Sequence, residues 1–160
     1  MDICEYALQL EKDGEKFYRN IADNTDDEGL KSIMLMLADE EVKHRKAIEK
    51  MQNNECQLAE TDILGDAKNI FQKMSEGKEN FDLGQEQIAI YKEAQEIERR
   101  SQLFYEEKAE EVEEEDKKEL LRRLAEEEKK HYFLLDNIIE FVSRPKYWLE
   151  NAEWNHLEQY

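Results

Sequence analysis

Apolar and small side chains recur every three or four residues along the first third of the chain, the spacing of helices that bury one face. In residues 3–23 the recurring positions are Ile3, Ala7, Leu10, Gly14, Phe17 and Ile21. In residues 30–51 they are Leu30, Met34, Leu37, Ile48 and Met51. The polar segment 24–29 between them contains residues that cap helices. The pattern therefore predicts two helices joined by a short turn.

The last part of the chain shows the same arrangement. A stripe over residues 85–112 consists of Ile90, Ala94, Ile97, Ser101 and Phe104. A second stripe begins near Asp116 and consists of Leu121, Leu124, Leu135, Ile138 and Val142. Pro145 is expected to end this helix, because proline has no backbone N–H to donate. The pattern predicts a second helical hairpin.

The middle of the chain, residues 53–83, interrupts this periodicity with Asn53, Asn54, Gly65 and Gly77 and contains one weakly amphipathic stretch, 66–74. We expect a long crossover that includes a short helix. Two hairpins joined by one long crossover have the topology of a ferritin-like four-helix bundle. The predicted fold class is therefore all-α, with residues 1–144 as the bundle. Residues 145–160 form a tail of the same domain, with a short helix that packs on the bundle or on a second subunit.

Composition narrows the function classes. The 160 residues suit one domain, and 41 acidic against 23 basic residues give a net charge of −18, which repels nucleic acid and anionic lipid. The apolar runs are only a few residues long, and the N-terminus lacks a signal peptide, so we expect a cytoplasmic protein without a membrane partner. Cys4 and Cys56 lie too far apart in sequence for a Cys-x-x-Cys site, and we expect reduced thiols.

Two polar pairs interrupt the apolar stripes. Glu41 and His44 fall on the stripe of the second long helix, and Glu128 and His131 fall on that of the fourth. Residues three apart lie on one helix face, so each carboxylate and imidazole can reach the same cation. A single Glu-x-x-His in so acidic a chain is more often a solvated helix face. Two copies within apolar stripes indicate metal ligands, because unpaired charges are rarely buried.

An internal repeat with an offset of 87 residues strengthens this interpretation. It aligns Glu11 with Glu98, Phe17-Tyr18 with Phe104-Tyr105, Leu37-Ala38 with Leu124-Ala125, Glu40-Glu41 with Glu127-Glu128, and Lys43-His44 with Lys130-His131. Each half thus contributes one further Glu. We predict that two divalent ions are held by Glu11, Glu41, His44, Glu98, Glu128 and His131, with Glu41 and Glu128 as bridges.

Other residues near this seam are candidates for supporting roles. Tyr18 and Tyr105 each follow a helical Glu by two turns, so their hydroxyls are placed to hydrogen-bond a ligand carboxylate. The alternative is a pair of core tyrosines with satisfied hydroxyls. Gly14 and Ser101 are small enough to leave an opening for a diatomic oxidant.

These motifs resemble those of the rubrerythrin di-iron domain over roughly residues 3–143, in particular Glu11 to Tyr18 with Glu41-x-x-His44 and their repeats. The resemblance implies a di-iron peroxidase that receives electrons from a rubredoxin-like iron site. Two cysteines cannot form such a four-cysteine site, so the donor would be a separate protein. Rubrerythrins also carry an additional Glu at the position where this chain has Ser101. Without that Glu the predicted centre is a symmetric one with six ligands, as in bacterioferritins.

The expected function is that of a non-haem di-iron oxidoreductase that reduces hydrogen peroxide, or dioxygen, with electrons from an external donor. Manganese or zinc are other metals that this ligand set accepts. We expect a homodimer. One alternative is a ferritin-like protein that oxidises and stores iron, and another is an interaction protein in which metal serves only folding.

Overall fold

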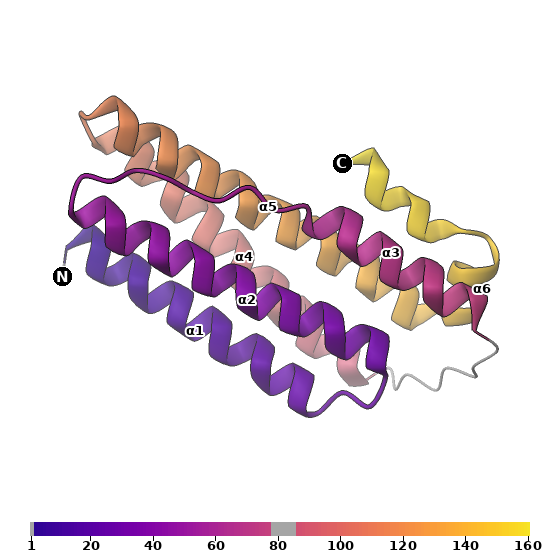
Figure 1. The fold of residues 1–160 in the computed structure, drawn as a ribbon. Helices are drawn as coiled ribbons and strands as arrows, with labels where there is room; N and C mark the ends of the chain where they lie inside the picture. The colour runs from indigo at the N-terminus through magenta and orange to yellow at the C-terminus, as the bar shows by residue number, and fades with distance from the viewer. Residues whose placement is uncertain (1, 78–85) are drawn as a thin grey trace.

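The computed structural model describes residues 2–77 and 86–160, and the regular elements in that part of the chain are all helical. Helices α1 (Ile3–Asp23) and α2 (Glu28–Gln52) form one antiparallel hairpin, and α4 (Glu86–Glu111) and α5 (Glu115–Ser143) form the other (Figure 1). The expected all-α, ferritin-like bundle is confirmed. None of the described helices combines the length and the apolar character needed to cross a membrane.

Side-chain caps explain where the first two helices begin. Asp2 accepts a hydrogen bond from the backbone N–H of Glu5 at 2.9 Å, and Asp27 accepts one from Leu30 at 2.9 Å. These carboxylates satisfy N–H groups that have no partner within the helix. Because Asp27 starts α2 soon after α1 ends at Asp23, the turn between them is short and the two helices lie side by side.

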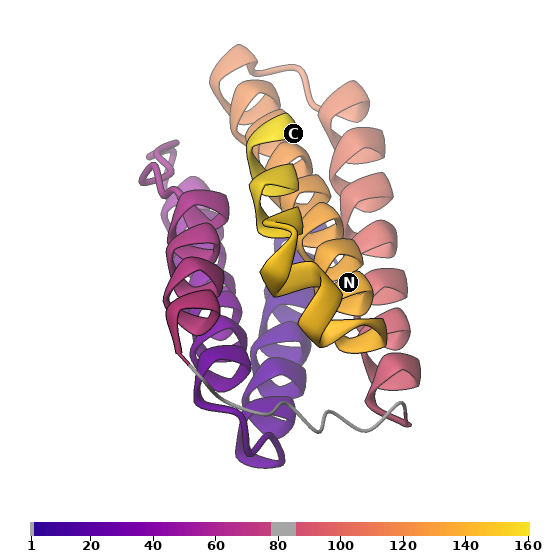
Figure 2. The same ribbon diagram turned by 90° about the vertical axis from the view of Figure 1, so that its right-hand side faces the viewer.

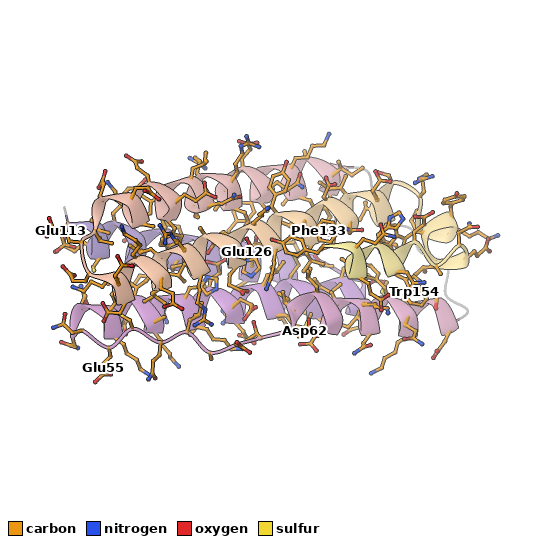
Figure 3. All side chains as sticks on the ribbon, turned by 90° about the horizontal axis from the view of Figure 1, so that it is seen from above. Glu55, Asp62, Glu113, Glu126, Phe133 and Trp154 are labelled. Carbon is orange, nitrogen blue, oxygen red and sulfur yellow. The ribbon has the colours of Figure 1, made fainter. Side chains whose placement is uncertain are left out.

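The described part of the crossover, residues 53–77, runs along the bundle and contains α3 (Ile63–Glu76) (Figure 1). The predicted helix 66–74 was too short at both ends. Asp62, labelled at the start of α3 in Figure 3, caps this helix by accepting from the backbone N–H of Gly65. Ile63 and Leu64 extend α3 because they bury their side chains against the bundle.

The buried face of α4 differs by one position from the prediction. Ile90 is 41% exposed, whereas Tyr91 beside it is fully buried. Adjacent helical residues point about 100° apart, so an error of one position moves a side chain from core to surface. The buried face follows Tyr91, Ala94, Glu98, Ser101, Tyr105 and Ala109. Gly84 and Gln85, near the predicted start of this helix, lie outside the described residues.

The tail packs on the bundle as two short helices rather than the single predicted one. Helix α6 (Pro145–Glu150) and the 3₁₀ helix η1 (Glu153–Gln159) are separated at Ala152, whose φ of 54° no helix continues through. Trp148 is 1% exposed, and its ring centroid lies 5.6 Å from that of Phe71 on α3. Figure 2 shows the tail folded back along α5, and Figure 3 places Phe133 and Trp154 on that side.

Among the described residues, the apolar core consists of two clusters at opposite ends of the bundle. The tail cluster joins α3 and the tail to one end of the four long helices, with Leu30, Leu37, Phe71, Phe141 and Trp148 among its members. The N-terminal cluster lies at the other end and includes Ala7, Ile48, Met51, Leu121 and Leu124. Between these clusters the bundle interior is polar.

Candidate metal centre

The polar interior is formed by the six residues that the sequence predicted as metal ligands. Helix α1 contributes Glu11, α2 contributes Glu41 and His44, α4 contributes Glu98, and α5 contributes Glu128 and His131. All six are at most 4% exposed. The structure thus brings together residues from both ends of the sequence, because the two hairpins face each other with their repeated motifs at the same level.

The six side chains form two overlapping groups of potential ligands. Glu11 and His44 belong to one group, Glu98 and His131 belong to the other, and Glu41 and Glu128 belong to both. Within each group one ligand atom from every residue lies within 4.8 Å of all the others. Two carboxylates shared between two four-residue groups have the arrangement of bridging ligands between two ions.

Both imidazoles direct Nδ1 toward the carboxylates. The Nδ1 atom of His44 lies 3.0 Å from Glu128 and 3.5 Å from Glu11. The Nδ1 atom of His131 lies 3.4 Å from Glu98 and 3.5 Å from Glu41. The two rings are nearly parallel, with centroids 5.5 Å apart. Each histidine therefore sits between carboxylates of both hairpins.

The two tyrosines connect the hairpins crosswise. The hydroxyl of Tyr18 on α1 donates a 2.5 Å hydrogen bond to Glu98 on α4, and that of Tyr105 on α4 donates one of 2.5 Å to Glu11 on α1. Burial and the nearby carboxylates, Glu98 and Glu11 respectively, raise the pKa of each phenol well above its ordinary value. The hydroxyls therefore keep their protons and orient the carboxylates that they contact.

Burial and mutual repulsion govern protonation of the carboxylates. Burial, followed by the negative charges of Glu11 and Glu98, raises the pKa of Glu41 well above its ordinary value. Burial and the charges of Glu41 and Glu98 do the same to Glu128. Burial by itself would raise the pKa of Glu98. The charge of His131 and the hydrogen bonds to the carboxylate outweigh burial and lower this pKa to about 2. A metal ion would therefore compete with protons for the two shared carboxylates.

His131 responds to the same charges. Burial by itself would lower its pKa, but the facing carboxylates, Glu98 first, raise that pKa well above its ordinary value. The carboxylates around this buried histidine thus favour its positively charged form in the absence of another cation. That charge offsets part of the repulsion between the acidic groups.

The donor atoms fit a pair of divalent cations. Within the described residues, Oε2 of Glu11, Oε2 of Glu98 and both ring nitrogens of His131 are buried and have no hydrogen-bond partner. Buried polar atoms are rarely left in that state. Four carboxylates and two imidazoles suit iron, manganese and zinc, and two divalent ions would balance the four negative charges. Gly14 contributes space, because a Cβ atom there would lie 3.0 Å from Oε2 of Glu41.

Sequence reasoning gave no role to three residues beside this cluster. Glu40 is 4% exposed, and its Oε1 atom accepts a 2.6 Å hydrogen bond from the hydroxyl of Thr61 in the crossover. Glu127 is the corresponding residue of the second half. The repeat contained a signal for both acids, since it aligned them with each other. Thr61 has no counterpart in the repeat, so only the fold reveals its contact.

A ferritin-like bundle with a paired carboxylate and histidine cluster defines the class of proteins that hold two metal ions between four helices. The chain belongs to the rubrerythrin family, whose family model matches residues 2–139. Membership in this family supports the assignment of the chain as a di-iron, ferritin-like protein. The buried Glu and His cluster is compatible with that assignment.

The fold is shared with a solved structure of a hypothetical protein from Pyrococcus furiosus, which superposes with a TM-score of 0.67. That protein is 24% identical in sequence, and the alignment covers 88% of each chain. No curated protein matches this sequence. The likeness to the Pyrococcus protein therefore concerns the fold alone.

Proposed function

We propose that this protein is a non-haem di-iron oxidoreductase that reduces hydrogen peroxide, or dioxygen, with electrons from a separate donor protein. The observation that carries the proposal is the sharing of Glu41 and Glu128 by both ligand groups, because it provides for two ions at one site. When bound, two iron(II) ions supply the two electrons that convert one hydrogen peroxide and two protons into two waters.

The protein's own residues confine and orient this chemistry. The six ligands are at most 4% exposed, so bulk water is excluded from the centre and electrostatic interactions within it are strong. Tyr18 and Tyr105 keep their protons and hold the Glu98 and Glu11 carboxylates in one orientation. Tyr18→Phe is expected to slow oxidation of the loaded protein by about tenfold while the bundle stays folded.

The electron donor is proposed to be a separate, rubredoxin-like protein. The chain contains two cysteines, Cys4 and Cys56, and both are free thiols. A rubredoxin-type iron requires four cysteine thiolates, which this chain cannot provide. Catalytic turnover would therefore depend on a docked partner that returns two electrons for each peroxide.

The proposal is tested by loading the protein with iron(II) without oxygen, measuring the iron content, and mixing it with peroxide in a stopped-flow spectrometer. We expect two irons per chain and oxidation of two irons by each peroxide. Glu49→Ala serves as a control, since Glu49 is on α2 but 53% exposed. Failure to take up iron, or a loaded centre inert to both peroxide and dioxygen, would rule out the proposed activity.

A further inference from the structure

Each half of the repeat contains a second carboxylate directly before its shared ligand: Glu40 before Glu41, and Glu127 before Glu128. These residues are not among the six ligands, yet Glu40 is 4% exposed and the Glu127 side chain is 17% exposed. Burying a carboxylate is costly unless it is paired. The structure must therefore offer each of them an interaction in the bundle interior.

For Glu40 that interaction is directed at a histidine of the other hairpin. While Nδ1 of His131 points to Glu41 and Glu98, its Nε2 lies 3.8 Å from Oε1 of Glu40. His131 is 0% exposed, and its Nε2 has no hydrogen-bond partner among the described residues. A movement of roughly 1 Å would bring this pair to hydrogen-bond distance.

Metal coordination makes this contact necessary. An imidazole that gives the Nδ1 lone pair to a metal ion carries its proton on Nε2. A buried N–H without an acceptor is destabilising, because it loses its hydrogen bond to water and gains none in the protein. Glu40 is already held in place as that acceptor, because the Thr61 hydroxyl donates to its Oε1 at 2.6 Å and Lys43 lies 3.7 Å from its Oε2.

Glu127 has the equivalent position in the second half. One of its carboxylate oxygens lies within 4.8 Å of a ring nitrogen of both His44 and His131. Its Oε1 contacts Lys130 at 3.3 Å, whereas its Oε2 is buried and has no partner among the described residues. Because the halves are related by the repeat and Glu40 faces His131, we expect the corresponding partner of Glu127 to be His44.

We propose that Glu40 and Glu127 are positioning residues that accept the outer N–H of His131 and His44, respectively, and hold each Nδ1 toward the metal pair. This inference rests on the proposed di-metal function. These contacts cross between the hairpins, as do the hydrogen bonds of Tyr18 and Tyr105, so each hairpin orients ligands of the other. Thr61 ties the crossover into the same network through Glu40.

The variants Glu40→Ala and Glu127→Ala test the proposal in zinc-loaded protein. Loss of a hydrogen-bond partner of a metal-bound histidine weakens metal binding by about 10–100-fold. We expect this loss in both variants, measured by zinc competition with a chelator of known affinity. Glu40→Gln, which retains an acceptor oxygen, should restore most of the affinity.

Asp39→Asn is the matched control, because Asp39 precedes Glu40 on α2 but is 65% exposed and pairs with Arg19. It removes one negative charge from the same helical turn without touching a histidine. Zinc affinity should remain within about twofold of wild type, since exposed ion pairs contribute little. An equal loss in Asp39→Asn would show that general charge, rather than positioning, controls binding, and would overturn the inference.

Nitrogen NMR of the histidines supplies a readout that a purely structural role would not move. The chain has three histidines, and His156 is a surface residue, so the signals of His44 and His131 can be separated. In zinc-loaded Glu40→Ala the outer N–H signal of His131 should shift and exchange with solvent faster, with a smaller change at His44. Glu127→Ala should show the reverse.

Thr61→Val provides a second route if Glu40→Ala does not fold. It keeps Glu40 but removes the hydroxyl that holds it, so the His131 signal should change with a loss in affinity smaller than that of Glu40→Ala. Wild-type protein that takes up no zinc would overturn both this inference and the proposed function. Wild type that binds two zinc ions, with unchanged affinity and histidine signals in folded Glu40→Ala or Thr61→Val, would overturn the positioning role alone.

Discussion

The polar centre and the two apolar clusters are built from the same four long helices but contribute to stability in opposite ways. In the clusters, side chains such as Leu37 and Leu121 are fully buried and stabilise the fold by about 25 cal/mol for each Å² removed from water. In the centre, Glu41 and Glu128 are also buried, yet burial of their charges is costly. Packing of the apolar ends holds the helices together. The stability gained there offsets the cost of burying the charged ligands in the centre.

This difference predicts that the two regions respond to separate perturbations. Removing an apolar side chain should weaken the fold whether or not metal is present. Changes in metal or pH should act mainly through the centre, because its protonation depends on which cations balance the carboxylates. Mutation of the apolar core, metal removal, mutation of a shared ligand and a change of pH would each test that separation.

The largest effect is expected from Phe71→Ala in the tail cluster. Phe71 is fully buried and contacts Phe141 and Trp148, so its removal should destabilise the protein by about 3–5 kcal/mol. Denaturant unfolding measures this change, with Leu103→Ala, at a 52% exposed position, as a control expected within about 0.5 kcal/mol of wild type. Folded Phe71→Ala should retain its metal; loss of metal would show that the regions are not separate.

Chelation should have the next largest effect. Ions that bind the folded centre but hardly bind the unfolded chain stabilise by about 2.7 kcal/mol for one site at a hundredfold excess over the dissociation constant. Differential scanning calorimetry before and after chelation should show a lower Tm for the metal-free protein. An unchanged Tm with metal loss confirmed would contradict the proposed site.

Glu41→Gln should separate metal binding from stability. Because burial and its neighbours raise the pKa of Glu41, removing its charge should stabilise metal-free protein by about 1–2 kcal/mol near neutral pH. The same change removes a shared ligand, so metal content should fall. Unfolding titrations and metal analysis measure the two effects, with Glu49→Gln on the exposed side of α2 as the control. A metal-free variant less stable than wild type would argue against repulsion in the centre.

The smallest effect is the pH dependence of metal-free protein. Glu41, Glu128 and His131 have raised pKa values in the folded state, so each contributes stability that is lost as pH rises through its folded pKa. Glu98, with its pKa lowered to about 2, contributes stability that is lost only below its ordinary value of 4.5. Above 4.5, stability of metal-free protein should therefore fall with rising pH.

Metal-loaded protein should behave differently over the same pH range. Rising pH removes the protons that compete with the metal ions for Glu41, Glu128 and His131, so metal binding should strengthen. Unfolding measured at several pH values with and without zinc would reveal the two trends. Parallel curves for the two forms would mean that these groups do not titrate in the centre.

Periodicity predicted most of the fold because a helix repeats its environment every three or four residues. The stripes of α2 and α5 were identified correctly, including the polar pairs within them. Periodicity was less reliable on α4, where Ile90 was assigned to the core in place of Tyr91. In the tail it did not reveal the break at Ala152, because one residue with a left-handed backbone leaves no pattern in the sequence.

The sequence by itself determined the hairpins, the repeat and the identity of the six candidate ligands, since these follow from spacing along helices. Only the tertiary structure decided which residues of one hairpin contact those of the other. Tyr18 reaches Glu98 across 80 residues of sequence, Tyr105 reaches Glu11 across 94, and Thr61 reaches Glu40 from the crossover. Such contacts have no periodic signature, because they depend on how separate elements pack in space.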